Sequence, residues 1–226
     1  MVEIIFGEEE IKRYAAKAGL GFNLIVKEAF LFAILDILRD YPFVLKGGTA
    51  INKGFLKDRQ RFSEDLDFDT NLSIKEIREI LSEEKLKIKR KYYTKHAHGF
   101  EIAYSYGKIR DIVKLEFSCK IAGNYSITTL KSEFLPLSLR FKVYTLKELI
   151  RQKEKSFINR REWKDLYDLY WMTKLYSKEF SISNKNAFLE ALNKVRVPKI
   201  ANSYIPLKNR VGWKVLIEEM RELLSK

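Results

Sequence analysis

Two short stretches decide the fold of this chain: KGGTA at residues 46–50 and RFSEDLDFD at residues 61–69. The first follows an apolar run at 43–45, which predicts a short buried strand. Its glycine pair predicts a turn, with a helix over 50–55 behind it. In the second stretch, Leu66 and Phe68 alternate with acidic residues, which is typical of a strand that buries one face. The two stretches therefore predict a strand, a glycine turn, a helix and an acidic strand in close succession.

Asp65 and Asp67 lie two positions apart on the predicted acidic strand, so both side chains should leave the same face. Two carboxylates held that close repel each other unless a cation lies between them. Hard oxygen ligands select Mg²⁺ or Mn²⁺. The alternative interpretation is a solvated acidic strand edge. Asp69 continues the same face, and we expect it to be exposed.

The glycine turn has features that suit a phosphate. Gly47 and Gly48 allow the backbone to come close to a ligand, and the amides at the start of the following helix attract an anion. Thr49 adds a hydroxyl that could donate to a phosphate oxygen. Taken alone this is a weak signal, because most such pairs form ordinary turns.

Outward from these stretches, the sequence divides into an α/β part and a helical part. Helical spacing of apolar residues predicts helices over 7–18, 22–40, 73–83, 163–175, 185–194 and 211–224. Alternating β-branched and aromatic residues over 85–119 predict antiparallel strands with a tight turn near His98 and Gly99. Thr145 and Glu148 match a capping box, so another helix should begin there.

The composition indicates a globular chain with a basic surface. Its 226 residues have a formal net charge of +13, 46% are hydrophobic, and Cys119 is the single cysteine. We expect contact with nucleic acid from the charge, no membrane association, and a reducing cytoplasm because no intrachain disulfide can form. His96 and His98 are expected to be ordinary strand-end residues.

A third group of residues lies further along the chain than these two stretches. Together with KGGTA and RFSEDLDF, it resembles the AbiEii/AbiGii toxin family of nucleotidyltransferases, within the DNA polymerase β superfamily. The likeness extends over roughly residues 22–175. The residues of this third group are Glu148, Gln152, Lys153, Arg160 and the run DLYDL at 165–169.

This resemblance implies an α+β fold: a polymerase-β-like domain with a mixed sheet flanked by helices, followed by helices that complete the cleft. We place the catalytic domain at 1–142 and the helical C-terminal domain at 143–226. It also implies transfer of a nucleoside monophosphate from an NTP to an acceptor hydroxyl, with release of pyrophosphate.

The resemblance further implies a role for individual residues. Asp65 and Asp67 would hold Mg²⁺ or Mn²⁺ with a third carboxylate from a neighbouring strand. Glu116 is our candidate for it, Asp111 is the alternative, and Glu116 as an ordinary exposed strand residue is another. The expected nucleotide-binding residues are Gly47, Gly48, Thr49, Ser63 and Lys153.

Two positions in the helical part are candidates for the site. Lys153 falls on an apolar helix stripe, so it should point into the core or a cleft, where an anion would be its partner. A snorkelling surface lysine is the alternative. Asp165 and Asp168 share a helix face, and Asp165 could orient Lys153 or the acceptor. A local ion pair of Asp168 with Lys164 is the alternative.

The acceptor follows from the charge and from the resemblance. The basic surface fits RNA, and relatives in the toxin group modify tRNA ends, so tRNA is the leading expectation. A protein acceptor stays open. A cognate antitoxin is the expected protein partner. The competing function is a non-catalytic nucleotide- or RNA-binding module that retains the fold.

Overall fold

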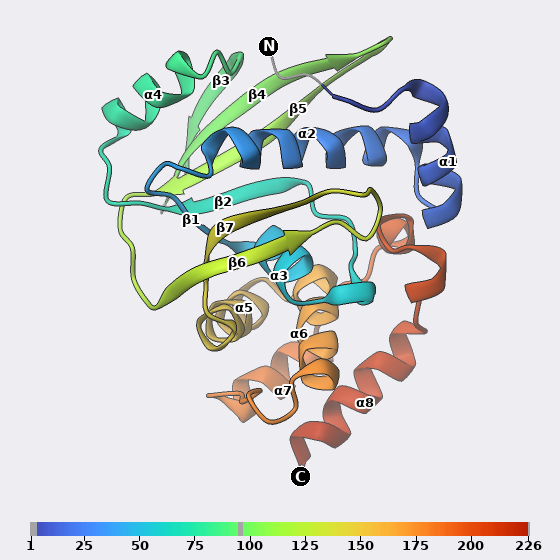
Figure 1. The fold of residues 1–226 in the computed structure, drawn as a ribbon. Helices are drawn as coiled ribbons and strands as arrows, with labels where there is room; N and C mark the ends of the chain where they lie inside the picture. The colour runs from blue at the N-terminus through green and yellow to red at the C-terminus, as the bar shows by residue number, and fades with distance from the viewer. Residues whose placement is uncertain (1–3, 95–96, 226) are drawn as a thin grey trace.

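A computed structural model describes residues 4–94 and 97–225, which form one seven-stranded mixed sheet with helices on both faces (Figure 1). The order of strands across the sheet is β3-β4-β5-β2-β1-β7-β6. The strands are β1 (Val44–Lys46), β2 (Asp65–Asp69), β3 (Ile88–Tyr93), β4 (His98–Tyr106), β5 (Ile109–Ser118), β6 (Tyr125–Lys131) and β7 (Ser138–Tyr144).

Eight α-helices of the described chain surround this sheet. Three short 3₁₀ turns, Lys57–Arg59, Lys199–Tyr204 and Leu207–Asn209, complete the connections. The α-helices are α1 (Glu8–Ala18), α2 (Phe22–Leu38), α3 (Gly47–Gly54), α4 (Ile74–Glu83), α5 (Leu146–Arg160), α6 (Trp163–Leu175), α7 (Lys185–Asn193) and α8 (Trp213–Ser225). The predicted α+β fold class, a mixed sheet with flanking helices and a helical C-terminal region, is confirmed.

Aromatic packing explains why the central strands hold together. Phe43, Phe68 and Phe117 come from neighbouring strands and are all fully buried. The Phe68 and Phe117 rings stack with centroids 5.2 Å apart, and Phe43 lies 5.0 Å from Phe117. Figure 1 shows α2 crossing this face of the sheet, which leaves the acidic residues of β2 on the opposite face.

Strand pairing fixes which side chains become neighbours across the sheet. β1 and β2 run antiparallel, with Lys46 opposite Asp67. β2 and β5 run parallel, with Asp67 opposite Glu116 and Asp65 opposite Lys114. Because side chains alternate along a strand, all five of these residues point to the same face, which we call the carboxylate face of the sheet.

Several boundaries differ from the sequence predictions. Helix α3 begins at Gly47, so the glycine pair is the first turn of the helix and not a separate turn before it. His98 and Gly99 lie inside β4, and the tight turn between β4 and β5 is at Gly107, where φ is +55° and a glycine is favoured. Strands β6 and β7 were not anticipated at all.

The start of α5 was predicted correctly, but by a motif that does not form. Thr145 is the N-cap residue, yet its side chain makes no capping hydrogen bond in the described structure. Glu148 accepts hydrogen bonds from Arg151 and Gln152 instead of turning back to the cap. Both partners lie within one helical turn of Glu148, so local side-chain pairing replaced the capping box.

Within the described residues, no single helix meets the length and apolarity needed to cross a bilayer. Helices α1 and α2 meet that criterion only as a pair bent by 109°.

A buried ion pair links α2 to α3 and gives a test of the fold. Lys53 Nζ lies 2.6 Å from Glu28 Oε1, and both side chains are fully buried. In Lys53→Met the Glu28 carboxylate would stay buried without its cation, so we expect the free energy of unfolding to fall by about 3–5 kcal/mol. The double variant Lys53→Met, Glu28→Leu removes both charges and should recover most of that loss in urea denaturation. An equal loss in both variants would contradict this account.

Candidate functional site

Three carboxylates lie side by side on the carboxylate face of β2 and β5. Asp65 and Asp67 are two positions apart on β2, and Glu116 is the register partner of Asp67 on β5. All three are partly buried. Asp69 does not join them and is not exposed as expected: it is 6% exposed and accepts hydrogen bonds from Lys46 and Tyr144.

The charges of these acids are not balanced by nearby cations. Burial, and after it the negative charges of Glu116 and Asp65, raises the pKa of the Asp67 carboxyl to about 6. Burial also raises the pKa of Asp65. Lys46 is the register partner of Asp67 on β1, but its ammonium group is paired with Asp69 and Ser118. The cluster therefore favours a cation that the protein itself does not supply.

The glycine pair lies directly against these acids. Gly47 adopts φ +70°, and a Cβ atom there would come within 2.1 Å of Asp67 Oδ2. A Cβ atom on Gly48 would lie 3.0 Å from Ser63 Oγ and 3.1 Å from Arg61 Nη2. The first turn of α3 can thus approach the carboxylates only because both residues lack a side chain.

The two hydroxyls expected to bind nucleotide are placed differently from each other. Thr49 is 1% exposed, and its hydroxyl donates to the backbone carbonyl of Asp65 at 2.6 Å. That hydroxyl therefore holds α3 against β2 and is not turned toward a ligand. Ser63 is 7% exposed, and its hydroxyl lies so close to Gly48 that a Cβ atom there would be 3.0 Å from it.

A cavity of about 500 Å³ opens between the glycine turn and α5. Asp67 and the glycine pair line it on the sheet side. Among the described residues, the cationic side chains that line it are Lys46, Arg151, Lys153, Lys155 and Arg160. A basic wall that faces a carboxylate and the start of a helix suits a ligand with several phosphate groups and a bound cation.

Lys153 is buried at the floor of this cavity and is held by two aspartates. Its Nζ atom lies 3.0 Å from Asp165 Oδ1 and 3.0 Å from Asp168 Oδ2. Burial opposes the charge, but these two carboxylates raise the pKa of Lys153 above its usual value. Asp165 also accepts a two-point contact from Arg160 at 2.9 Å. Asp165 is 1% exposed, so it positions Lys153 and Arg160 and does not itself face the cavity.

Asp168 pairs with Arg61 and not with Lys164. Arg61 donates to both Asp168 oxygens, at 2.9 Å from Nε and 2.6 Å from Nη2. Lys164 instead reaches Glu64 at 2.9 Å. Asn52 donates to Asp168 Oδ1 and to the carbonyl of Gly48. We call Asn52, Arg61, Lys153, Asp165 and Asp168 the buried polar network.

Sequence reasoning missed Arg61 and Asn52. Arg61 was part of the quoted motif but received no role, although an arginine before a buried phenylalanine suggests a paired charge. Asn52 gave no signal, because its partners are 4 and 116 residues away along the chain.

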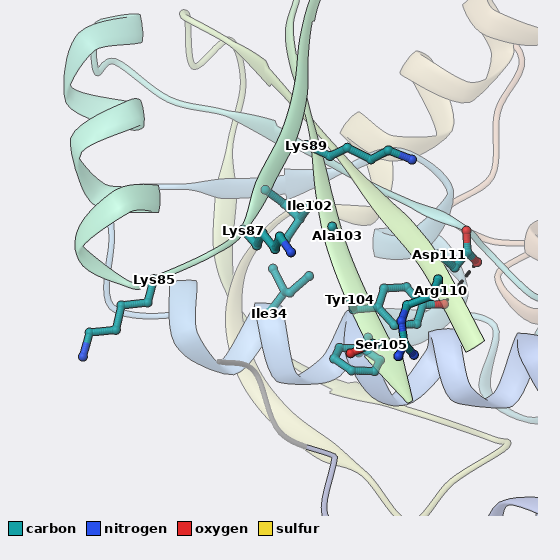
Figure 2. Close-up of a pocket in the computed structure, with 11 residues that line it drawn as sticks. Ile34, Lys85, Lys87, Lys89, Ile102, Ala103, Tyr104, Ser105, Arg110 and Asp111 are labelled. Atoms are coloured by element: carbon teal, nitrogen blue, oxygen red, sulfur yellow. Dashed lines mark hydrogen bonds between the residues drawn. The ribbon is translucent and has the colours of Figure 1, made fainter. Parts of the chain in front are cut away.

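The structure separates the two candidates for the third carboxylate. Glu116 lies beside Asp67 and accepts a hydrogen bond from the Tyr92 hydroxyl at 2.9 Å. Asp111 faces the other side of the sheet, where it pairs with Lys27 and accepts a hydrogen bond from Tyr104 (Figure 2). It lines a different cavity, of about 430 Å³, beside α2.

The histidines do not bear on this site. His98 begins β4, and its ring meets Tyr93 edge-on at 5.2 Å. His96 lies outside the described residues.

The three carboxylates suit a divalent cation in chemistry, but they do not enclose one. Nowhere in the described ranges are three carboxylate, histidine or cysteine side chains gathered tightly enough to hold a metal ion by themselves. Mg²⁺ is commonly bound by one or two carboxylates, with the remaining ligands supplied by substrate phosphates and water. Asp65, Asp67 and Glu116 fit that kind of site, with the basic cavity on the side where phosphates would lie.

The raised pKa of Asp67 predicts that removing its charge stabilises the folded protein, by an amount that depends on pH. Between the ordinary value of 3.8 and about 6, the unfolded chain loses this proton before the folded chain does. Stability therefore falls as pH rises through that range. We expect Asp67→Asn to raise the free energy of unfolding by roughly 1–3 kcal/mol at pH 8, measured in urea without divalent cations. The gain should vanish near pH 4.

The exposed Asp40→Asn provides the control, since it should change stability little at either pH. If Asp67→Asn is no more stable than the parent at pH 8, a positive charge in the protein already balances the Asp67 carboxylate.

The chain is similar to one family of known proteins and to solved structures. The family model described as "Nucleotidyl transferase AbiEii toxin, Type IV TA system" matches residues 29–225. The structure of JHP933 from Helicobacter pylori matches with a TM-score of 0.65 at 22% identity, covering 91% of this chain and 92% of that one. The nucleotidyltransferase toxin MenT4 from Mycobacterium tuberculosis matches with a TM-score of 0.62 at 15% identity, covering 98% and 90%.

At 22% and 15% identity, these two structural matches show a shared fold. A search of curated proteins finds no significant match. The family model, in contrast, covers most of the sequence and agrees with the motifs at residues 46–50, 61–69 and 165–169. This chain therefore belongs to the AbiEii family of nucleotidyltransferase toxins.

Proposed function

We propose that this protein transfers a nucleoside monophosphate from an NTP to a hydroxyl group of RNA, with tRNA as the first acceptor to test. One observation supports this above all. The carboxylates of Asp65, Asp67 and Glu116 lie side by side, and Asp67 lies against Gly47 at the edge of a cavity with a basic wall. A site for a divalent cation thus adjoins a site for a triphosphate.

The cavity provides the nucleotide side of the reaction. Gly47 and Gly48 line it together with five cationic side chains. Four of them are held in place by carboxylates, and Lys155 has no ion pair among the described residues, so together they offer oriented donors to a triphosphate. Lys153 is fixed by Asp165 and Asp168, and Arg160 is fixed by Asp165, so neither cation has to be ordered when substrate binds. Such preorganisation is the main contribution that a protein makes to phosphoryl-type transfer.

The carboxylates provide the reaction centre. A bond would form between the acceptor oxygen and the α-phosphorus of the NTP, while the bond from that phosphorus to the bridging oxygen breaks and pyrophosphate leaves with it. Mg²⁺ or Mn²⁺ held there would make the acceptor hydroxyl more acidic and neutralise the leaving group. Asp65, Asp67 and Glu116 place those charges, and the hydroxyl of Tyr92 restrains one oxygen of Glu116.

The biological setting follows from the family. We infer that the chain acts as the toxin of a toxin–antitoxin pair, in the cytoplasm, with a cognate antitoxin as its protein partner. The net charge of +13 supports an RNA acceptor over a neutral small molecule. The exposed, unpaired Cys119 suits a reducing compartment.

The test uses total RNA and each α-labelled NTP in turn, with MgCl₂ or MnCl₂, followed by identification of the labelled species. We expect one RNA class to be labelled by the parent protein. Labelling should fall to background in Asp65→Asn, Asp67→Asn and on addition of EDTA. Gly47→Ala should also abolish it, because the new methyl group would displace the Asp67 carboxylate.

Lys214→Gln, on α8, is the matched surface control and should label RNA normally. Label on the protein itself would point to self-modification. A parent protein that binds Mg²⁺–NTP but labels nothing would favour the non-catalytic binding module, and labelling that survives loss of both aspartates would overturn the proposal.

A further inference from the structure

One row of side chains runs from the carboxylates to the outer edge of the sheet. Asp67 on β2 is opposite Glu116 on β5, which is opposite Gly99 on β4, which is opposite Tyr92 on β3. With strands about 4.8 Å apart, this row extends roughly 14 Å from the reaction centre. The proposed nucleotide cavity lies at the other side of Asp67, so this row is not part of it.

Tyr92 lies flat on the sheet at the end of that row. A Cβ atom on Gly99 would come within 2.1–2.5 Å of three carbon atoms of the Tyr92 ring, so the ring covers Gly99 where another residue would have a side chain. The Tyr92 hydroxyl reaches Glu116 at 2.9 Å, and the side chain is only partly buried. Gly99 thus allows a partly exposed aromatic ring to lie beside the carboxylates.

The next row adds positive charge beside this ring. Asp65 is opposite Lys114, which is opposite Glu101, which is opposite Arg90. Lys114 is exposed, and the Arg90 side chain is 64% exposed while it pairs with Glu101. The Arg90 guanidinium carbon lies 5.7 Å from the centre of the Tyr92 ring.

Further along the strands, the positive charge lies at the other side of the sheet. Arg110 donates to the carbonyls of Gly107 and Ile109 and, with Ser105, lines the cavity beside α2 (Figure 2). The helices on the carboxylate side lie elsewhere: α3 contacts β1, β2, β6 and β7, and α5 and α6 pack on α3 (Figure 1).

We propose that this open face of β3, β4 and β5 binds the single-stranded end of the acceptor nucleic acid, with a base stacked on Tyr92 and the backbone phosphates near Lys114 and Arg90. The proposal rests on the proposed function. A flat aromatic ring next to cations fits single-stranded nucleic acid, because a base can stack while its phosphates meet the positive charges. An acidic peptide would use the cations but would gain little from the ring.

The position of the row also gives the acceptor its direction. A nucleotide stacked on Tyr92 lies next to Glu116 and one further strand from Asp67. Its terminal hydroxyl can then point toward the carboxylates, while the triphosphate enters from the basic cavity on the opposite side of Asp67. The two substrates would meet from opposite sides of the acid pair.

The experiment measures binding of a fluorescent single-stranded RNA oligonucleotide to the full chain by anisotropy, in EDTA and without NTP, so that no transfer is required. Tyr92→Phe keeps the ring and should bind within about twofold of the parent. Tyr92→Leu removes the ring at similar volume and should bind about tenfold more weakly, which corresponds to about 1.4 kcal/mol. Because Tyr92→Phe also removes the hydrogen bond to Glu116, a loss in both variants would assign Tyr92 to positioning Glu116 and overturn the stacking role.

A charge-matched pair tests the cations. The double variant Arg90→Gln, Lys114→Gln should weaken RNA binding and reduce the slope of log affinity against log salt by about 1–2. The control, Lys199→Gln with Lys214→Gln, removes the same charge from the C-terminal region and should leave the slope unchanged. Equal effects of the two doubles would mean that binding is spread over the whole basic surface, against the proposal.

Two further readouts separate this proposal from the proposed function. Mg²⁺–NTP binding, followed by thermal stabilisation, should be the same in Tyr92→Leu as in Tyr92→Phe, because both variants lose the hydrogen bond to Glu116 and only Tyr92→Leu loses the ring. If loss of the Tyr92 ring weakens RNA binding but the parent labels no RNA, the proposed transfer reaction is wrong and the proposed acceptor surface is supported. If the parent labels RNA but Tyr92→Leu binds the oligonucleotide as tightly as the parent does, the acceptor surface is elsewhere. The same conclusion follows if polyglutamate displaces the oligonucleotide equally well from the parent and from Tyr92→Leu.

Discussion

The site depends on one buried ion pair, between Arg61 in the segment before β2 and Asp168 in the middle of α6. Arg61 is 2% exposed and Asp168 is fully buried, so removing either charge alone would leave a buried charge short of a partner. Asn52 also donates to Asp168, and Lys153 forms an ion pair with it. The Arg61 guanidinium donates in addition to the backbone carbonyl of Phe62. The pair therefore fixes α6 against the α3 turn from which the glycines reach the acids.

This constraint explains how the two parts of the chain build one cavity. The sheet part contributes Asp67 and the glycine turn, and α5 contributes the basic wall. Lys153 and Arg160 keep their positions because Asp165, on α6, holds both. The DLYDL run thus acts through the cations that it orients, and the carboxylates of β2 and β5 are left without a matching positive charge. Divalent cations bound at these acids would correct that imbalance.

The two sides of the acid pair differ in a way that suits two different substrates. The side proposed for the nucleotide is a recess in which buried aspartates hold Lys153 and Arg160. The opposite side is an open sheet surface on which Tyr92 lies over Gly99 between exposed cations. A recess with fixed charges favours a small ligand that always has the same shape. An open surface with a ring accommodates a polymer, of which only the end needs to be placed accurately.

The sequence by itself determined the local features: the alternation that puts Asp65 and Asp67 on one face, the helix Trp163–Leu175, and the motifs that identify the family. These follow from periodicity within a few residues. Only the tertiary structure decided that Glu116 and not Asp111 adjoins Asp67, that Asp69 is buried, and that Asp168 pairs with a residue 107 positions away. Strand register and buried charge pairing join distant segments, and no local pattern encodes which partner will be adjacent.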